Sequence, residues 1–326
     1  MKTPKNILKQ HNLTPNKRLG QNFLTDKKVL AKIIQAADLL STSDVVIEIG
    51  PGTGILTLEL AKYAKKVIAV EKDRKIAEIL KNILIENNIK NVEIIEGDIL
   101  KIENSLCHSR PCFAKGYDEA SESGNPDNKH SGSRIPRSEP RAGKCGMTNN
   151  KNYKIIANIP YYLTSPLIRK FLEFENQPEI MVLMIQKEVA QRICAQPPRM
   201  TLLSIATQFY AEPKIISYVS KKSFFPQPKI DSAIIKITPR NTPPFSLPLV
   251  RGGLGWGQFR DRFFKVVKAA FSQPRKQLVN NLSKGLNLTR EQTEKILSQC
   301  GIKPTQRPSE LSVDKYLELT WKTYGK

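Results

Sequence analysis

The tetrapeptide Asn158-Ile159-Pro160-Tyr161 combines groups that could hold and activate a flat, amine-bearing ring. Asn158 offers a side-chain carbonyl, and Pro160 forces Ile159 into an extended conformation that leaves its carbonyl free to accept a hydrogen bond. Tyr161 offers an aromatic face for stacking. The exocyclic amine of a nucleobase is a poor nucleophile, because its lone pair is delocalised into the ring. Acceptors for the amine hydrogens let the nitrogen pyramidalise, so the tetrapeptide suits methylation of such an amine.

The tetrapeptide must be positioned by the element before it. Residues 154–157 are a short apolar run, typical of a buried strand that ends at Asn158. A plain turn after a strand would show the same residues, and the tetrapeptide alone favours that simpler interpretation. A second site is needed to decide between the two.

The second site is a glycine-rich turn. Residues 45–49 predict a strand with Glu48 inside it, Gly50, Gly52 and Gly54 follow, and residues 55–60 begin a helix. Glycines let the backbone approach a ligand at the carboxyl end of the first strand, where open α/β sheets bind nucleotides. The spacing is G-x-G-x-G, whereas the dinucleotide fingerprint is G-x-G-x-x-G.

Two further acids follow predicted strands. Residues 66–70 form a strand that ends in Glu71, whose carboxylate could accept both hydroxyls of a ribose. Residues 92–95 form a third strand that leads to Asp98, which could accept the amine of an adenine ring. A glycine turn with these two acids suits adenosyl recognition without a pyrophosphate, and therefore favours S-adenosylmethionine over NAD as cofactor.

These residues carry a family resemblance. Five motifs occur in one order, at residues 18–24, 48–52, 158–161, 186–189 and 224–232. The chain resembles the small-subunit rRNA adenine N6,N6-dimethyltransferases of the KsgA type over most of residues 14–240 and into the carboxyl-terminal part. The resemblance implies that S-adenosylmethionine contacts six residues, Asn22, Leu24, Gly50, Glu71, Asp98 and Asn158. It also implies that Tyr161 holds the target adenine beside Phe224, although Phe224 could instead be a core aromatic that leads into the strand at 232–237.

The charge of the chain agrees with an RNA partner. It has 52 Lys and Arg against 30 Asp and Glu, a net charge of +22 and a pI of about 9.8. Such a field attracts polyphosphate, although a membrane surface would fit as well. Residues 1–25 contain basic residues and no acid, which predicts a mobile basic arm. Residues 260–276 interleave six basic side chains with phenylalanines, which predicts a helix with one apolar and one cationic face.

The order of elements predicts a Rossmann-like class I methyltransferase sheet at 26–240, mainly parallel and covered on both faces. Helices are expected near 27–39, 73–87, 165–174 and 187–195, with further strands near 181–185 and 213–219. After residue 257 the helical periods, broken by Pro274, Gly285 and Gly301, predict a small all-helical RNA-binding domain at 258–326. Pro274 enters a basic helix that the family usually keeps free of proline.

Two segments depart from this pattern. Residues 105–150 are rich in Ser, Gly, Pro, Asn and charges, which predicts a disordered insertion, and residues 241–257 read as a low-complexity insertion between domains. The larger insertion puts the family geometry of the Asp98 loop in doubt. It also holds three of the five cysteines, Cys107, Cys112 and Cys145, at spacing too irregular for a zinc site, so we expect no metal.

The function implied by the resemblance is dimethylation of two adjacent adenosines in small-subunit (16S) rRNA during ribosome biogenesis. One alternative is a large-subunit rRNA adenine methylase of the Erm type, which shares Asn-Ile-Pro-Tyr. Another is a ribosome-assembly factor that acts mainly by binding rRNA. No apolar run approaches membrane-spanning length, so we expect a cytoplasmic protein without a membrane partner. We also expect a monomer.

Overall fold

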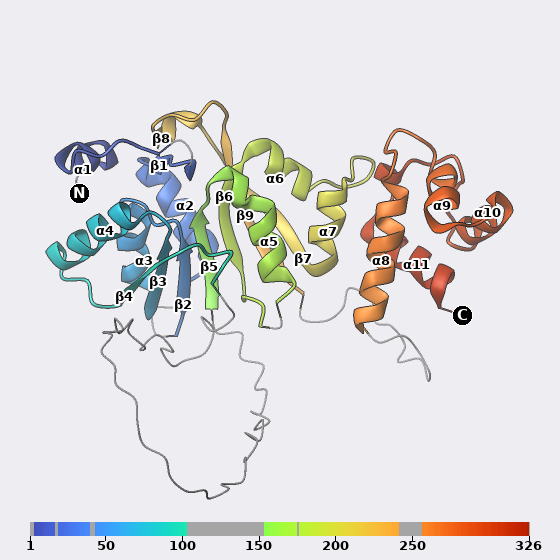
Figure 1. The fold of residues 1–326 in the computed structure, drawn as a ribbon, viewed down its shortest axis with the longest axis horizontal. Coiled ribbons are helices and arrows are strands. Elements are labelled where there is room, and N and C mark those ends of the chain that lie inside the picture. Colours follow the sequence, from blue (N-terminus) through green and yellow to red (C-terminus); the bar gives the residue numbers. More distant parts are fainter. Residues whose placement is uncertain are drawn as a thin grey trace, which may run out of the picture.

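A seven-stranded sheet with helices on both faces forms the larger part of the molecule, and a group of helices lies beside it (Figure 1). The structure is a computed structural model that describes residues 3–16, 19–39, 43–102, 153–174, 176–240 and 256–325. The predicted insertion at 105–150 lies outside the described residues, as does nearly all of the predicted linker at 241–257.

The strand order of the sheet is β4-β3-β2-β5-β6-β9-β7. Five neighbouring strands run parallel: β4 (Val92–Glu96), β3 (Lys66–Glu71), β2 (Val45–Ile49), β5 (Tyr153–Asn158) and β6 (Met181–Gln186). The strand β9 (Ser232–Pro239) is antiparallel to both of its neighbours, β6 and β7 (Ala211–Val219). The sheet is therefore mainly parallel, as predicted, and the carboxyl ends of β2, β3 and β5 lie at one edge.

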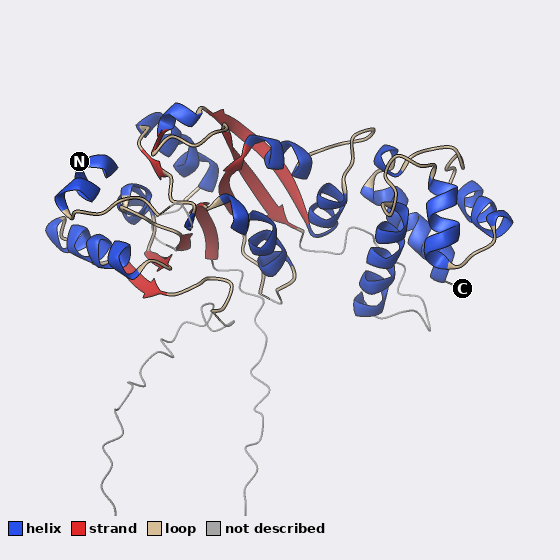
Figure 2. Ribbon diagram, turned by 45° about the horizontal axis from the view of Figure 1, so that its top comes forward, coloured by secondary structure: helices blue, strands red, loops and turns tan. Residues whose placement is uncertain are grey.

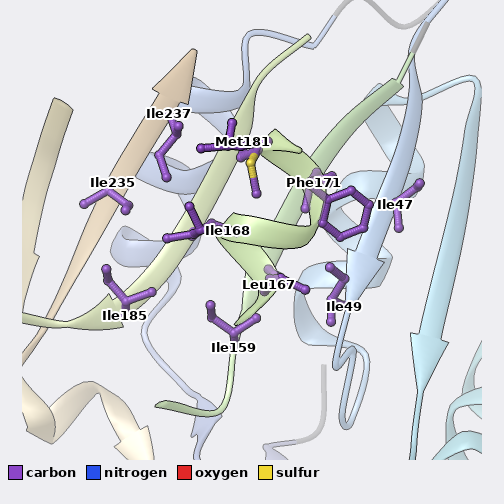
Figure 3. Packing of buried hydrophobic residues seen from close by; sticks show 14 of the residues in the cluster. Ile47, Ile49, Ile159, Leu167, Ile168, Phe171, Met181, Ile185, Ile235 and Ile237 are labelled. Atoms are coloured by element: carbon purple, nitrogen blue, oxygen red, sulfur yellow. The ribbon is translucent and has the colours of Figure 1, made fainter. Parts of the chain in front are cut away.

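Alternating side chains along each strand divide the core into two layers. Helices lie on both faces of the sheet (Figure 2). Ile47 and its counterparts on β5, β6 and β9 pack against α5 (Thr164–Leu172) and α6 (Lys187–Ile193). Figure 3 shows Leu167, Ile168 and Phe171 of α5 lying against this face. Val46 points to the other face, which α2 (Lys27–Ala37), α3 (Ile55–Tyr63) and α4 (Arg74–Glu86) cover.

The amino-terminal segment differs from the mobile arm that its charge predicted. Pro4–Gln10 form the helix α1, whose amino end is capped by the side chain of Thr3. Ile7 and Leu8 are buried, and Leu8 packs in one cluster with Phe23 and Ile76. Charge alone did not indicate this packing, in which two buried apolar side chains belong to a segment that is otherwise basic.

A second, two-stranded sheet joins parts of the chain that are far apart in sequence. The strand β1 (Phe23–Leu24) pairs antiparallel with β8 (Phe224–Phe225), with Leu24 opposite Phe224. The Thr25 backbone and side chain both donate hydrogen bonds to the carbonyl of Ser223. Figure 1 shows α1, β1 and β8 together above one end of the large sheet.

The carboxyl-terminal region is helical, as predicted. It contains α8 (Trp256–Ala270), α9 (Leu278–Leu286), α10 (Arg290–Gln299) and α11 (Val313–Tyr324). Phe259 and Phe263 of α8 are buried, whereas Lys265 and Lys268 are exposed, so the apolar and cationic faces of this helix are present. Arg262 also contacts the chain end, because its guanidinium donates one hydrogen bond to the carbonyl of Tyr324.

One basic segment is not where we expected it. Arg275 and Lys276 lie in the turn between α8 and α9 rather than on a helix, because α8 ends at Ala270, before Pro274. Gln277 then occupies the N-cap position of α9, without a capping hydrogen bond from its side chain.

The helix α7 (Leu202–Tyr210), which was not predicted, joins the sheet to the helical region. Its residue Phe209 is fully buried and stacks on Phe263 of α8 with 4.3 Å between the ring centroids. The Met200 backbone N–H, just before α7, donates to the carbonyl of Ser309 at 3.0 Å. The core of the helical region therefore includes side chains from the part of the chain that forms the sheet and its helices.

Phe263→Ala tests this shared core. Removing a fully buried ring that stacks across the junction should lower the free energy of unfolding by about 3–5 kcal/mol. Urea denaturation measures this loss. The aromatic control is Tyr63→Ala, at a side chain that is 41% exposed, which should change the free energy of unfolding by less than about 0.5 kcal/mol. A loss below about 1 kcal/mol in Phe263→Ala would contradict a shared core.

Candidate functional site

One pocket at the carboxyl edge of the sheet collects every residue that the sequence assigned to a site. It is lined by residues from the first motif, the glycine turn, the two acid loops, the tetrapeptide and β8. The predicted members are Asn22, Leu24, Gly50, Glu71, Asp98, Asn158, Pro160, Tyr161 and Phe224. The parallel strands explain why distant motifs meet here, since β2, β3 and β5 all end at this edge.

The glycine turn forms the floor of the pocket. Gly50, Gly52 and Gly54 have φ values of +68°, +58° and +81°, a region that other residues rarely adopt. A Cβ atom on Gly52 would lie 2.9 Å from the ring of Phe23, and one on Gly54 would lie 2.5 Å from a methyl carbon of Leu80. Both backbone conformation and close packing therefore require glycine.

Glu71 is held rigidly at the end of β3. Its Oε2 accepts a hydrogen bond from the Gly52 N–H at 3.2 Å, and its Oε1 accepts one from the Asp73 N–H at 2.9 Å. The residue is only 7% exposed, and burial raises the pKa of its carboxyl although the backbone donors oppose this shift. Each oxygen keeps a second lone pair, so the carboxylate can still accept two hydroxyls from a ligand.

Asp98 is held by a residue that the sequence did not single out. Its Oδ1 accepts from the Leu100 N–H at 3.0 Å, and its Oδ2 accepts from Lys72 Nζ at 2.9 Å. Burial alone would raise the pKa of Asp98, but these two hydrogen bonds and the positive charges of Lys72 and Lys101 together hold the pKa below its usual range. Asp98 is therefore an ionised acceptor in the pocket wall. The turn that follows is closed by hydrogen bonds, since the N–H groups of Lys101 and Ile102 both donate to the carbonyl of Asp98.

Asn158 connects the tetrapeptide to the first motif. Its Nδ2 donates to the carbonyl of Asn22 at 3.0 Å. This hydrogen bond fixes the orientation of the amide, and the side-chain oxygen can accept from other donors. The Asn22 Nδ2 donates in turn to the carbonyl of Gly20 at 3.1 Å. Gly20 lies so close to Pro160 that an added Cβ would be 3.2 Å from the proline Cβ. The two motifs therefore form one wall.

Tyr161 is half-buried in this wall. Its hydroxyl shares a hydrogen bond with the hydroxyl of Ser232 at 3.0 Å, and Ser232 is fully buried at the start of β9. Burial raises the pKa of the Tyr161 phenol, so it stays neutral. Phe224 lines the same pocket and is 5% exposed, packed in a hydrophobic cluster with Leu24. Its position is compatible with contact to a bound base and with a core role.

Glu48 is a buried acid among the residues that line the pocket, and the sequence left its role open. The side chain is 1% exposed, and neither carboxyl oxygen has a hydrogen-bond partner among the described residues. Burial raises the pKa of Glu48 to about 8, and the nearby Glu71 carboxylate adds to this shift against the effect of the Thr57 hydroxyl. The carboxyl is therefore protonated at neutral pH. Strongly perturbed acids of this kind concentrate at functional sites.

The Glu48 carboxyl should make the fold less stable as pH rises. An unfolded Glu titrates at about 4.3, so between that value and about 8 the folded protein holds a proton that the unfolded chain has released. The free energy of unfolding must then fall with increasing pH. Glu48→Gln should remove this part of the dependence and be more stable than the wild type at pH 8 by on the order of a few kcal/mol.

Urea denaturation between pH 5 and pH 8.5 measures this difference. Glu93→Gln, at a side chain that is 44% exposed on the edge strand β4, is the matched control and should follow the wild type. If the curves of wild type and Glu48→Gln were parallel over the whole range, Glu48 would be ionised in the folded protein.

Comparison with known proteins agrees with this geometry. The sequence model of the ribosomal RNA adenine dimethylase family matches residues 12–322. The Ribosomal RNA small subunit methyltransferase A of Dehalococcoides mccartyi is 36% identical over 316 residues, which cover 97% of this chain and 91% of the relative. The protein of the same name from Clostridium botulinum is 36% identical over 97% of this chain and 96% of its own length.

Solved structures share the fold. The 23S rRNA methyltransferase ErmE has a TM-score of 0.64 and 24% identity, over 92% of this chain and 99% of that one. A dimethyladenosine transferase from Plasmodium falciparum has a TM-score of 0.64 and 23% identity, over 93% and 98%. At these identities the likeness concerns the fold, and it confirms the predicted Rossmann-like methyltransferase sheet with a helical carboxyl-terminal region. The family match and the full-length relatives show that this chain belongs to the ribosomal RNA adenine dimethylase family, as its five motifs predicted.

Proposed function

We propose that this protein transfers methyl groups from S-adenosylmethionine to N6 of adenines in small-subunit (16S) rRNA. It would dimethylate two adjacent adenosines during ribosome biogenesis. The observation that carries the proposal is the two-sided pocket, in which Glu71 and Asp98 lie on one side and the tetrapeptide at Asn158 lies on the other. The relatives that are 36% identical are named for the small subunit, which supports the choice of target.

The pocket residues fit S-adenosylmethionine. Bound there, the cofactor supplies a methyl group that its sulfonium has already activated. Glu71 would accept the ribose hydroxyls, because each of its oxygens has one backbone donor and one remaining lone pair. Asp98 would accept the adenine amine, and the glycine turn leaves room for the chain of the ligand. The buried acid Glu48 below the turn suits a ligand that carries positive charge.

On the opposite side, the tetrapeptide would hold the target base. The side-chain oxygen of Asn158 and the carbonyl of Ile159 would accept the hydrogens of the target amine, so that its lone pair becomes available for attack. The ring of Tyr161 would stack on the extruded base. Catalysis then consists mainly of orientation, which can lower a barrier by several kcal/mol. No strong base is needed, because the alkylated amine is acidic and can lose its proton to solvent.

The target subunit separates this proposal from two alternatives. An Erm-type enzyme would act on the large subunit, but the likeness to ErmE is at the level of the fold, while the more similar relatives are named for the small subunit. A pure assembly factor would need no intact acceptor set in the pocket.

We propose a cytoplasmic monomer with immature small subunits as partner. Among the described residues, none of the helices is long and apolar enough to cross a membrane.

Methyl transfer from labelled S-adenosylmethionine tests the proposed target. Immature small subunits, large subunits and naked rRNA are incubated in parallel, and the labelled nucleoside is identified after digestion. We expect N6,N6-dimethyladenosine in small-subunit rRNA. Label confined to large-subunit rRNA would favour the Erm-type activity, and tight binding to small subunits without label would favour the assembly factor.

Glu71→Ala tests the cofactor side. Loss of the ribose acceptor should weaken S-adenosylmethionine binding by about 1.5–3 kcal/mol, the range of hydrogen bonds to a charged group. Calorimetric titration measures the affinity, with Glu93→Ala on the neighbouring strand as a control that should bind like the wild type. Unchanged affinity in Glu71→Ala would rule out the ribose assignment.

Tyr161 variants test the target side. Tyr161→Ala should lower kcat/KM for RNA by about 5- to 150-fold, the equivalent of the 1–3 kcal/mol that stacking of one base on an aromatic ring contributes. Tyr161→Phe should keep most of the activity, and its loss of the Ser232 hydrogen bond should cost about 1 kcal/mol of stability. Both variants should bind the cofactor normally. Equal losses of activity would show that the hydroxyl, and not the ring, is what the reaction needs.

A further inference from the structure

Lys170 makes three hydrogen bonds whose purpose the pocket residues described so far do not account for. The residue lies in the last turn of α5, is only partly exposed, and its Nζ donates to three backbone carbonyls. The acceptors are the oxygens of Ile99 at 2.8 Å, Leu100 at 3.2 Å and Ile102 at 2.6 Å. An ammonium group has three N–H donors and no acceptor, so this arrangement uses its full capacity.

The three carbonyls belong to the turn that carries Asp98. The N–H groups of Lys101 and Ile102 donate to the carbonyl of Asp98, and the Asp98 carboxylate accepts from the N–H of Leu100. With the N–H groups turned toward Asp98, the carbonyls of the turn gather near the Lys170 ammonium. The turn is therefore fixed from two sides, by its own hydrogen bonds to Asp98 and by Lys170 from α5.

The same helix carries the opposite wall of the pocket at its other end. Thr164, the first residue of α5, donates its hydroxyl hydrogen to the carbonyl of Tyr161 at 3.1 Å. Between the two ends, Leu167 and Phe171 are buried against the sheet, which fixes the helix in place (Figure 3). One rigid helix thus connects the wall of Tyr161 to the loop of Asp98.

We propose that Lys170 is a positioning residue for cofactor recognition: its triple hydrogen bond to the 99–102 turn sets the reach of Asp98 to the exocyclic amine of the adenosyl group. The inference rests on the proposed function, because it requires an adenosyl ligand in this pocket. Lys170 is not among the residues that line the pocket. Its loss should relax the turn and displace the Asp98 carboxylate, while Glu71 and the glycine turn keep their own hydrogen bonds.

Lys170→Met tests the proposal, because methionine keeps an unbranched, apolar stem and removes the ammonium. Affinity is measured by calorimetry for two probes, S-adenosylhomocysteine and its 6-deamino analogue, in which hydrogen replaces the amine. The wild type should prefer S-adenosylhomocysteine by about tenfold or more, since the analogue lacks the amine that would donate a hydrogen bond to the ionised Asp98. In Lys170→Met this preference should fall to about threefold or less, with little change in affinity for the analogue.

The matched control is Arg169→Met, at the neighbouring and largely exposed position on the same helix, where the arginine pairs with Glu173. It should keep the preference of the wild type. Lys170→Gln, whose amide can still donate to a carbonyl, should give an intermediate preference and serves if the methionine variant is too unstable to titrate.

The possible outcomes distinguish a failure of the positioning role of Lys170 from a failure of the proposed cofactor. An equal loss of affinity for both probes in the Lys170 variants would assign Lys170 to the stability of the fold alone and overturn the positioning role. An unchanged preference would overturn it as well. If the wild type bound neither probe, the proposed cofactor itself, and with it this inference, would be wrong.

Discussion

The register of three parallel strands is the constraint on which the site depends. Ile49 at the end of β2 lies opposite Val70 of β3 on one side and Ala157 of β5 on the other. The next residues along the three strands are Gly50, Glu71 and Asn158. A glycine turn, a buried carboxyl group and an amide side chain are therefore brought to one edge of the sheet by backbone pairing alone. A shift of one residue in either pairing would turn a ligand-facing side chain to the other face of the sheet.

Three acids that are buried or partly buried are the second organising feature of the pocket. Glu71 is stabilised by two backbone donors, and Asp98 by a lysine and a backbone N–H, whereas Glu48 has no partner among the described residues. A pocket with three acids favours a ligand that brings positive charge and hydrogen-bond donors, since an acid that ionises beside a cation regains part of the cost of its burial. S-adenosylmethionine carries both.

The sequence was most informative where local pattern and structure coincide. The apolar runs at 45–49, 66–70 and 154–157 are buried on both faces of the sheet, so their composition alone marks them as strands. The family motifs then led to the pocket residues, and the pocket contains all of them. These predictions needed no knowledge of contacts between distant residues.

The features that could not be predicted depend on such contacts. The pairing of β1 with β8 joins two-residue strands that lie 200 positions apart, which leaves no periodicity to detect. The helix α7 is buried between the sheet and the helical region, so it lacks the polar face by which a surface helix is recognised. Lys72 and Lys170 resemble any other lysine in the sequence, and only the folded chain shows that they hold the Asp98 loop.

The central claim is that one pocket holds the adenosyl cofactor and the target base on opposite walls. A crystal structure of the full chain with S-adenosylhomocysteine tests it most directly. The account predicts the ribose hydroxyls at hydrogen-bonding distance from both oxygens of Glu71, the adenine amine at Asp98, and the homocysteine sulfur directed toward Asn158 and Tyr161. An adenosyl group bound outside this pocket, or a sulfur directed away from the tetrapeptide, would contradict it.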